Sequence, residues 1–466
     1  MRVGPTLILP GVLHARLQKH LLPSDGLEAA AILCCTRMKC GEQLKLLCKD
    51  VVLVPHEACV REDDHIQWPG ESLMDAIDLA EQGSLTLILI HSHPGGFYDF
   101  SWADVVSDRR VIPQIFANYE SSDREELVHG SAIMVPGGAI KARLYNEQLD
   151  LIPIELVAVY GDDIHLFWGK DSTVPKRPLA FSSDMRTELG KLTALVVGYS
   201  GTGSITAEQL ARIGIGGLIV VDYDRVEPRN LNRIINSTVG DADSETLKVE
   251  VFRRAVTSFR PDMLLEYLPL SINEREAVLA AAQADIIFCC VDSEDGRFVC
   301  DAMSSAFLQP IFDVGVVIPV RKGLDGEQII VDINGRVDYV QPGGASLMDR
   351  GVYSPDSLRA EELARRDPQA HAEQVKAGYM PGANEQAPAV ITVNMQAASL
   401  CVQELIARLY PYRLDGNKNF ARTKFGLIDG EFEYLAETEF SRTQRYNWAI
   451  GLQEPLLGLP SLSKTA

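Results

Sequence analysis

The sequence lacks several features that mark membrane-bound and secreted proteins. No uninterrupted apolar run approaches the roughly 20 residues that a helix needs to span a bilayer. Residues 1–11 contain one Arg and no small-residue cleavage pattern, so we expect no signal peptide. The nine cysteines include the adjacent pairs Cys34–Cys35 and Cys289–Cys290, which suit buried strands better than a disulfide framework. We therefore expect a cytoplasmic protein with no membrane partner.

Positive charge is also scarce. Lys and Arg number 44 against 64 Asp and Glu, and the formal net charge is −20. An acidic surface repels phosphate backbones, which argues against a nucleic-acid partner. Such a surface would suit a basic protein partner, although in most proteins it only confers solubility. Apolar residues make up 46% of the 466 residues, which is enough to build two or three domains with sizeable cores.

We expect an α/β protein with three regions. Residues 1–150 mix short strands with helices, residues 151–182 indicate a strand pair and a connector, and residues 183–466 alternate strands and helices. This alternation predicts a parallel, doubly wound, Rossmann-like sheet. Residues 340–385 are polar and rich in Gly and Pro, and we expect a mobile excursion there. The elements that we expect are strands at Leu27–Cys35, Leu44–Pro55, Leu85–Ile90, Leu192–Val197, Gly217–Val221, Asp285–Val291 and Pro310–Val314, and helices at Met74–Glu81, Ser204–Ile213 and Val390–Leu409.

Two histidines stand at the end of an apolar strand in the first region. His91 and His93 are two positions apart on an extended segment, so their side chains point to the same side. Asp104 follows at the start of a helix that Ser101 caps, and it can supply a third ligand. Three protein ligands leave the fourth position of a zinc ion open to water, as in catalytic sites. Zinc lowers the pKa of such a water to about 7.

The run from His91 to Asp104 resembles the H-x-H-x(7)-S-x-x-D motif of the JAMM family of zinc isopeptidases at every defined position. That family adds a glutamate on an early strand, and Glu28 stands in the matching context ahead of an apolar strand. The resemblance implies that His91, His93 and Asp104 bind zinc. It also implies that Glu28 acts as general acid and base and that Ser101 stabilises the oxyanion. The family cleaves peptide or isopeptide bonds after the C-terminal glycine of ubiquitin-like proteins.

A glycine-rich turn follows the first strand of the last region. Gly198, Gly201 and Gly203 lie between this strand and a helix, where a phosphate can approach the backbone and the positive helix end. Many dinucleotide enzymes have such a turn. Asp222, at the end of the second strand, is placed to bind ribose hydroxyls. Arg233 adds a cation that a triphosphate needs and that NAD does not.

The run from Gly198 to Arg233 resembles the ThiF, MoeB and ubiquitin-activating enzyme family without a gap, except that Ser200 replaces the second glycine of the family turn. Further matches are Cys289–Asp292 with Ser293 and Arg297, Ile311–Gly315 and Ala389–Asn394. The resemblance implies adenosine binding for Gly201 and Asp222, contact with the phosphates for Asn230, Arg233 and Lys248, and Mg²⁺ binding for Asp292. A plain NAD-binding domain is the alternative, and Arg233, Lys248 and Asp292 argue against it.

The chemistry that this second resemblance implies is adenylation. The C-terminal carboxylate of a protein attacks the α-phosphate of ATP, and an acyl adenylate and pyrophosphate form. Mg²⁺, Lys248 and Arg233 would offset the charge that builds on the phosphates. Residues 1–150 would then form a JAMM/JAB domain, residues 151–182 a connector and residues 183–466 a ThiF-type domain.

Some family features are missing. Ser346 and Asp349 stand where many relatives have a zinc-binding cysteine pair, so we expect no second zinc site. No cysteine lies between Cys300 and Cys401, the region where activating enzymes usually place a thioester cysteine. The remaining candidates, Cys289, Cys290, Cys300 and Cys401, sit in apolar segments. We expect the second half to stop at the acyl adenylate.

Together the two resemblances imply an enzyme of a bacterial ubiquitin-like system, of the kind implicated in antiviral defence. One chain could trim or release a ubiquitin-like protein and then activate its C-terminal glycine, because tethering raises the effective concentration of a shared substrate. A conjugating enzyme would be a further partner, and a homodimer is expected, with Arg186 a candidate donor to the neighbouring ATP site. Two alternatives stay open: activation of a sulfur-carrier protein, and a non-catalytic ThiF module that presents a tail to the JAMM site.

Overall fold

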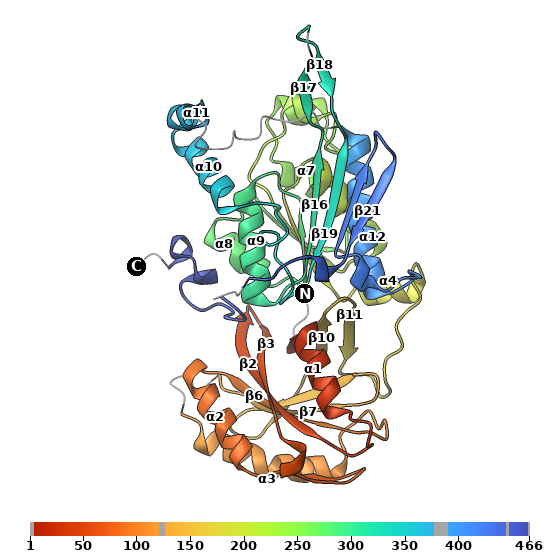
Figure 1. The fold of residues 1–466 in the computed structure, drawn as a ribbon, viewed down its shortest axis with the longest axis vertical. Coiled ribbons are helices and arrows are strands. Elements are labelled where there is room, and N and C mark those ends of the chain that lie inside the picture. The colour runs from red at the N-terminus through yellow and green to blue at the C-terminus, as the bar shows by residue number, and fades with distance from the viewer. Residues whose placement is uncertain (1–3, 121–125, 324, 377–389, 444–446, 465–466) are drawn as a thin grey trace.

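The computed structural model describes residues 4–120, 126–323, 325–376, 390–443 and 447–464. They form two large sheets, one in the lower and one in the upper half of Figure 1. The α/β fold class expected from the sequence is confirmed. None of the helices in the described ranges is long and apolar enough to cross a membrane.

The lower sheet has nine strands and is built mainly from the first 150 residues. In sheet order they are β11 (Ile164–Trp168), β10 (Leu156–Tyr160), β1 (Thr6–Pro10), β3 (Gln43–Leu53), β2 (Ala30–Cys40), β6 (Thr86–Ser92), β7 (His129–Met134), β8 (Ile140–Tyr145) and β9 (Leu151–Pro153). Alternate residues of β2 enter different cores because successive side chains of a strand point to opposite faces. Ala31 and Leu33 pack with α1 (Gly11–Leu21), while Ile32 and Cys34 pack with α2 (Glu71–Gly83) and α3 (Trp102–Asn118).

The strands expected at Leu27–Cys35, Leu44–Pro55 and Leu85–Ile90 are confirmed as β2, β3 and β6, with ends shifted by one to five residues. The helix expected at Met74–Glu81 is α2. The strand pair expected within residues 151–182 is β10 and β11, and β10 pairs with β1. The lower sheet therefore extends to Trp168, beyond the boundary expected at 150, because a parallel pairing with the first strand of the chain is invisible to local pattern. Two further two-stranded sheets, β4 (Val60–Arg61) with β5 (Ile66–Gln67) and β17 (Val320–Lys322) with β18 (Gln328–Ile330), complete the strands.

The upper sheet has eight strands, in the order β14 (Leu264–Leu268), β13 (Gly217–Val221), β12 (Thr193–Val197), β15 (Ile286–Cys289), β16 (Ile311–Val317), β19 (Asn334–Val340), β20 (Arg422–Gly426) and β21 (Glu431–Leu435). The first five are parallel and the last three are antiparallel. The chain leaves β12 towards one edge and returns beside it as β15. Open α/β sheets bind ligands in the crevice that such a reversal marks, here outside the carboxyl ends of β12 and β15.

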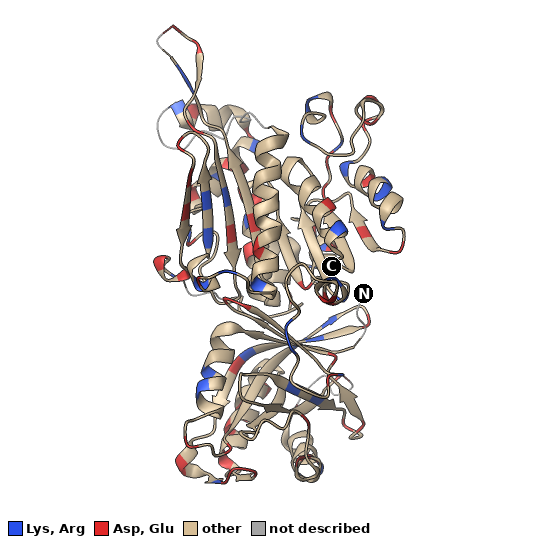
Figure 2. Ribbon diagram, turned by 90° about the vertical axis from the view of Figure 1, so that its right-hand side faces the viewer, with Lys and Arg blue, Asp and Glu red and all other residues tan. Residues whose placement is uncertain are grey.

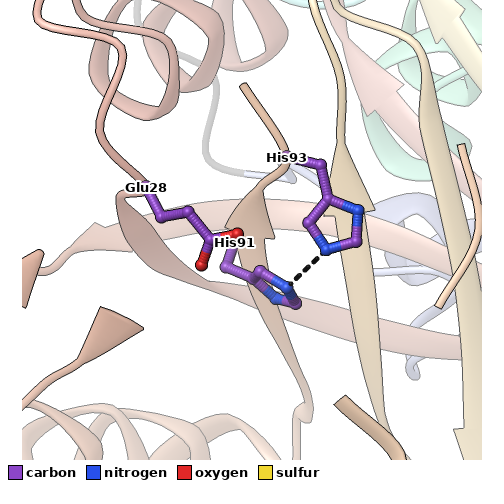
Figure 3. A group of neighbouring side chains, drawn as sticks. All are labelled: Glu28, His91 and His93. Carbon is purple, nitrogen blue, oxygen red and sulfur yellow. Dashed lines mark hydrogen bonds between the residues drawn. The ribbon is translucent and has the colours of Figure 1, made fainter. Parts of the chain in front are cut away.

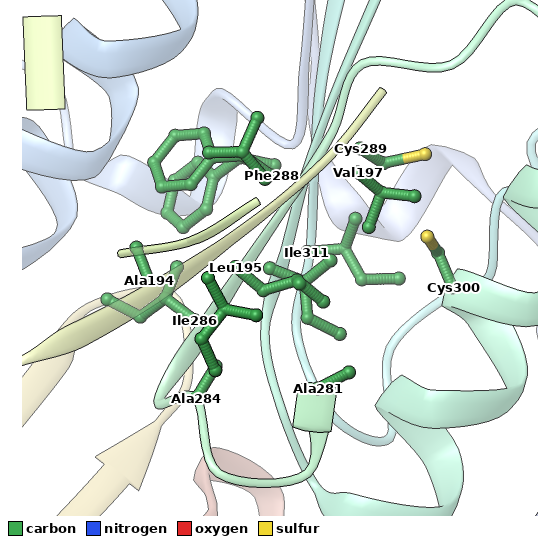
Figure 4. Close-up of a cluster of buried hydrophobic side chains, with 14 of the residues drawn as sticks. Ala194, Leu195, Val197, Ala281, Ala284, Ile286, Phe288, Cys289, Cys300 and Ile311 are labelled. Carbon is green, nitrogen blue, oxygen red and sulfur yellow. The ribbon is translucent and has the colours of Figure 1, made fainter. Parts of the chain in front are cut away.

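Helices cover both faces of the upper sheet. One face carries α5 (Gly201–Ile213), α7 (Lys248–Phe259) and α12 (Ile391–Leu409), and the other carries α8 (Arg275–Ala281) and α9 (Glu294–Phe307). Beneath the crevice, the buried side chains of Val197, Cys289 and Cys300 meet (Figure 4). The expected helices at Ser204–Ile213 and Val390–Leu409 are α5 and α12, and α5 begins three residues earlier than predicted.

Residues 340–385, expected to be a mobile excursion, contain two helices, α10 (Pro355–Arg366) and α11 (Pro368–Lys376). That expectation is therefore wrong for residues 355–376, and residues 377–385 lie outside the described part. The local signal was present: Ser354 caps α10, its hydroxyl accepting a hydrogen bond from the Ser357 N–H, and Pro355 occupies the first helical position. The polar composition of the segment indicates irregular structure, whereas these helix-cap residues mark the start of a helix.

The two sheets meet in a continuous junction. Lys45 on β3 is fully buried and donates hydrogen bonds to the carbonyl oxygens of Ala282, Gln283 and Ala284, just after α8. The C-terminal segment also contributes to the junction, where Trp448 Nε1 donates to the Lys49 carbonyl at 3.0 Å. Hydrophobic residues of β1, β2, β10 and β11 belong to the same core cluster as those of the upper sheet. The junction is therefore a packed interior and not a linker.

Charge is distributed over both halves of the molecule. Acidic and basic segments occur along strands and loops of the upper and lower sheets alike in Figure 2. Part of the charge is buried: Asp313, Asp338 and Arg350 are almost inaccessible and lie in a chain of ion pairs along β16 and β19. Some of the acidic residues that make the net charge negative are therefore buried and paired with arginine.

Candidate metal and nucleotide sites

The carboxyl end of β6 brings the four JAMM-type residues together. The antiparallel register pairs Ala30 of β2 with His91 of β6, so Glu28, two residues before Ala30, reaches the histidine side chains. Figure 3 shows the carboxylate of Glu28 beside His91, with His93 on the far side of the His91 ring. The ligand atoms of these three residues all lie within 4.8 Å of one another. Strand pairing, which sequence spacing cannot show, makes Glu28 part of the site.

Asp104 completes this group from the first turn of α3. Its Oδ1 lies 3.0 Å from His91 Nε2 and its Oδ2 lies 3.5 Å from His93 Nε2, while the two Nε2 atoms are 3.0 Å apart. Ligands bound tetrahedrally to zinc at about 2.0–2.1 Å are separated by roughly 3.3 Å. Two imidazole nitrogens and a carboxylate at these separations fit a zinc ion.

Local structure orients each ligand. Ser101 is the N-cap of α3: its hydroxyl accepts a hydrogen bond from the Asp104 N–H at 3.2 Å, and the Asp104 carboxylate accepts one from the Ser101 N–H at 2.5 Å. This capping box holds the carboxylate towards the histidines. His93 Nδ1 pairs with the Phe97 carbonyl oxygen at 2.8 Å, which leaves Nε2 to face the site.

The electrostatics match a site for a cation. Burial opposes the ionised form of Asp104, yet hydrogen bonds from His91 and His93 hold its pKa well below the ordinary range. Burial alone would lower the pKa of His93, but hydrogen bonds to Asp104 and to the Phe97 carbonyl raise it. Burial raises the pKa of Glu28, and the two histidines oppose only part of that rise. Glu28 is therefore the carboxyl in this group that protonates most readily.

A surface pocket of about 620 Å³ adjoins the metal-binding group. It is lined by the exposed side of α1, by the segment from Leu22 to Gly26, by Pro94 and by the turn at Pro136–Gly137. Two of the lining residues are close in sequence to the site: Pro94 follows His93, and Gly26 stands two residues before Glu28.

The second candidate site lies at the crevice of the upper sheet. The glycine turn between β12 and α5 requires glycine at each predicted position. Gly198 has φ +87°, and a Cβ there would lie 2.9 Å from the Cys290 carbonyl oxygen. A Cβ on Gly203 would lie 1.8 Å from the Gly198 carbonyl oxygen, and one on Gly201 would lie 2.1 Å from Asn394 Nδ2. The turn therefore packs tightly, against Cys290 on one side and against Asn394 of α12 on the other, at the N-terminus of α5.

Asp222 and Lys248 lie together next to this turn. The Asp222 carboxylate accepts hydrogen bonds from the N–H groups of Tyr199 (2.6 Å) and Asp224 (2.8 Å). Lys248 is buried at the start of α7, with Nζ 2.6 Å from Asp224 Oδ2 and 4.0 Å from Asp222 Oδ2. Burial raises the pKa of Asp222, and Lys248 opposes part of the rise. The Lys248 ammonium therefore lies close to Asp222, next to the position that the sequence predicts for a nucleotide.

The other predicted nucleotide residues surround the same turn, in different environments. Arg233 places its Cδ 3.2 Å from the Cβ position of Gly201, and its guanidinium donates to the Arg229 carbonyl. Asn230 is buried and its Oδ1 accepts from the Glu227 N–H at 3.0 Å. Asp292 is exposed beyond the end of β15. The fold brings these residues to the carboxyl edge of the parallel strands, although Asn230 has a structural partner of its own.

Sequence reasoning assigned no role to Asn394 or to the ion pairs behind the crevice. Asn394, on α12, is the residue that forbids a side chain at Gly201. Asp313, inside the matched Ile311–Gly315 segment, pairs with Arg297 at 3.2 Å and Arg336 at 2.8 Å. The match to late family segments was the available signal, but only the contacts show what these residues support.

The cysteines near this site are not placed for nucleophilic chemistry. Cys289, Cys290, Cys300 and Cys401 are all buried. A hydrogen bond with Cys300, together with burial, raises the pKa of Cys289. Burial also raises the pKa of Cys290 to about 12 and raises the pKa of Cys401. Arg186, on α4 (Ser183–Leu189), packs beside Gly214, at the end of the sheet away from the glycine turn of its own chain.

Two family models match the chain. The ThiF family covers residues 176–442, and the model described as prokaryotic homologs of the JAB domain covers residues 10–145. Among curated relatives, ubiquitin-like modifier-activating enzyme 5 of Drosophila willistoni is 30% identical over 187 residues, which are 37% of this chain and 41% of that protein. The same-named enzyme of Caenorhabditis elegans is 29% identical over 162 residues, 32% of this chain and 35% of that protein. The chain thus spans less than half the length of these relatives.

Solved structures of Escherichia coli MccB are also similar. MccB with ATP has a TM-score of 0.41 and 18% identity, covering 57% of this chain and 68% of that one. MccB with N-formylated MccA has a TM-score of 0.42 and 18% identity, and the match covers 54% of this chain and 67% of that one. The ThiF model alone matches more than half of the residues. The chain therefore belongs to the ThiF family, with a prokaryotic JAB-type domain joined on its N-terminal side.

Proposed function

We propose that this chain is a bifunctional enzyme of a bacterial ubiquitin-like system. The JAB-type half cleaves peptide or isopeptide bonds at the C-terminus of a ubiquitin-like protein, and the ThiF-type half adenylates the C-terminal glycine with ATP. The observation that carries the proposal is the convergence of Glu28, His91, His93 and Asp104 in one group at the end of β6. A domain that served only as a scaffold would not need to keep four such side chains together.

In the first half, His91, His93 and Asp104 would hold zinc. When bound, the ion supplies an electrophile that acidifies water and polarises a carbonyl. Glu28 takes up the proton from the attacking water and returns it to the leaving amine, a role that suits its raised pKa. The Ser101 hydroxyl already accepts from the Asp104 N–H, so its own hydrogen is available for the oxyanion of the scissile carbonyl.

In the second half, the tail carboxylate attacks the α-phosphate of ATP and pyrophosphate leaves. The turn at Gly198, Gly201 and Gly203 would cradle phosphate at the N-terminus of α5, and Asp222 would bind the ribose. Lys248 and Arg233 would offset the phosphate charge, with Asn230 beside them. Asp292, exposed next to the crevice, would hold Mg²⁺. The buried thiols support release of the adenylate to another molecule.

The two halves can be tested separately. Purified chain should contain one zinc, and Glu28→Gln should keep the metal while losing cleavage of a ubiquitin-like protein with a C-terminal extension. Incubation with ATP, radiolabelled pyrophosphate and a ubiquitin-like protein ending in glycine should yield labelled ATP, and Asp292→Ala should abolish this exchange. Glu28→Gln is the matched control for the exchange, and Asp292→Ala is the matched control for cleavage.

The outcomes also separate the alternatives. Cleavage without exchange for any glycine-ended partner would mean that the ThiF half is a binding module for the JAB half. Exchange with a sulfur-carrier protein, but not with a ubiquitin-like protein that has a cognate conjugating enzyme, would move the chain to cofactor or metabolite synthesis. A chain that binds neither zinc nor ATP would contradict the proposal as a whole.

A further inference from the structure

We infer that the two sites of one chain face opposite ends of a single rigid body. A tail released at the metal site would then reach the nucleotide site only after its protein has left the chain, and one chain could hold two ubiquitin-like proteins at once. The inference rests on the proposed function for what each site does. The placement of the sites follows from strand register and from the contacts of the junction.

The metal site lies at the end of β2 that is remote from the junction. Ala30, the first residue of β2, pairs with His91. Cys40, the last residue, places its Sγ 3.6 Å from the Ala282 carbonyl oxygen of the upper half. Ten residue steps of a strand cover about 33 Å. Along β2, the metal site is therefore separated from this contact by nearly the whole length of the strand.

The nucleotide site lies at the opposite end of the upper sheet. Ala284, which accepts a hydrogen bond from Lys45, stands two residues before the start of β15. The Asp285 N–H donates to the Thr193 carbonyl at the start of β12. Both strands run from there away from the lower sheet, over a further distance of about 13 Å to Val197. Figure 1 shows the two halves stacked along the longest axis of the molecule. Laid end to end, the two spans add up to a separation on the order of 45 Å between the sites.

Contacts on two sides of the junction oppose closure of one half onto the other. On one side are the Lys45 hydrogen bonds and the bond of 2.6 Å from the Thr36 hydroxyl to the Ala449 carbonyl. On the other side, Tyr339 donates to the Gly161 carbonyl at 2.7 Å and Arg408 donates to the Asp162 carbonyl at 2.6 Å. A rotation about either side would break the contacts of the other and would leave a buried charge without its partners.

Only a long tail could bridge this separation. A fully extended chain gains at most about 3.6 Å per residue, so a span on the order of 45 Å needs roughly 13 residues with no folded part attached. Linking two sites raises effective concentration only where one substrate can engage both, and that benefit vanishes when geometry forbids it. Fusion of the two halves therefore ensures that both activities are made in equal amounts. The substrate does not pass directly from one site to the other.

The distance between the sites can be measured without activity. The partly exposed Cys59 is replaced by Ser, and spin labels are attached to Phe97→Cys, beside His93, and Tyr223→Cys, beside Asp222; Phe97 and Tyr223 are both exposed. Electron–electron resonance spectroscopy, with excess unlabelled chain to suppress contacts between copies, should give one narrow distance of about 40 Å or more. Zinc, ATP and Mg²⁺ should leave it unchanged. A second population at less than half that distance, with or without ligands, would overturn the inference.

A control variant shows that the measurement can detect opening. Lys45→Met should broaden the distance distribution, because the junction loses three hydrogen bonds; if that variant does not fold, Trp448→Phe removes the contact to the Lys49 carbonyl instead. Failure of the proposed function would appear elsewhere, as missing zinc or missing pyrophosphate exchange. The measured distance between the labels does not depend on either activity.

Discussion

Lys45 Nζ lies 2.7 Å from the carbonyl oxygen of Ala284, across the junction of the two sheets. Residues 239 positions apart in the sequence are thereby joined by a buried, charged hydrogen bond. The contact joins the lower sheet to the segment that leads into β15, a central strand of the candidate nucleotide site. The junction is thus an integral part of the fold.

Replacement of Lys45 by Met should destabilise the whole chain. The variant removes the buried cation from the carbonyl oxygens of Ala282, Gln283 and Ala284, and we expect a loss of about 3 kcal/mol in the free energy of unfolding. Urea denaturation followed by fluorescence measures it. Lys39→Met is the matched control, because Lys39 is exposed in an ion pair with Glu126, and it should cost less than about 1 kcal/mol. Equal losses for the two variants would contradict the assignment.

Replacement of Asp104 by Asn should remove zinc while leaving α3 intact. Asn keeps an oxygen to accept from the Ser101 N–H, so the cap survives, but the anionic ligand is lost. We expect zinc affinity to fall at least about 100-fold, measured by competition with a chelator and by elemental analysis. Asp99→Asn, at an exposed carboxylate paired with Lys141, should leave the zinc content unchanged. Zinc retained in Asp104→Asn would remove Asp104 from the ligand set.

Replacement of Gly201 by Ala should abolish ATP binding. The added Cβ would lie 2.1 Å from Asn394 Nδ2, so the turn or α12 must shift. We expect at least about a 100-fold loss of ATP affinity, roughly 2.7 kcal/mol, by calorimetry. Gly240→Ala is the control, since the nearest atom to its Cβ, Thr238 Oγ1, is 3.7 Å away. Addition of Asn394→Ala to Gly201→Ala should restore part of the affinity, and no recovery would mean that another contact dominates.

Acid should destabilise the chain through His129. This side chain is fully buried, and burial lowers its pKa to about 3. The unfolded chain takes up a proton near pH 6.5 and the folded chain does not, so the stability present above that pH is lost as pH falls towards 3. The expected slope is about 1.4 kcal/mol per pH unit from this group. Urea denaturation between pH 6 and pH 4 measures the slope of the free energy of unfolding against pH, and this slope should be smaller by about that amount in His129→Asn. An unchanged slope would exclude His129 as its source.

Alkylation should find few reactive thiols. Eight of the nine cysteines are buried, and Cys59 is the partly exposed one. Iodoacetamide should therefore modify Cys59 alone in the native chain, as counted by mass spectrometry, and all nine cysteines in denaturant. ATP, Mg²⁺ and a glycine-ended ubiquitin-like protein should produce no adduct that a reducing agent cleaves. Such an adduct on Cys289, Cys290, Cys300 or Cys401 would refute adenylation as the last step on this chain.

Local signals in the sequence were sufficient for many individual parts. The spacing from His91 to Asp104 predicted two imidazoles on one side of a strand end and a carboxylate at a helix start, and their atoms lie within 3.5 Å. The glycine turn and the expected strands around it were also found. These features are short-range: strand alternation, helix caps and turn conformation depend on residues a few positions apart.

Long-range pairing decided the rest. The sequence by itself determined which residues could bind zinc or phosphate and which strands and helices would carry them. Only the tertiary structure placed Glu28 beside His91, through the pairing of β2 with β6, added β10 and β11 to the lower sheet, and set Asn394 against Gly201. Only the tertiary structure shows that the two sites lie at opposite ends of the molecule. Their separation depends on contacts between segments that are distant in the sequence, such as that of Lys45 with Ala284, and no periodicity or motif predicts such a contact.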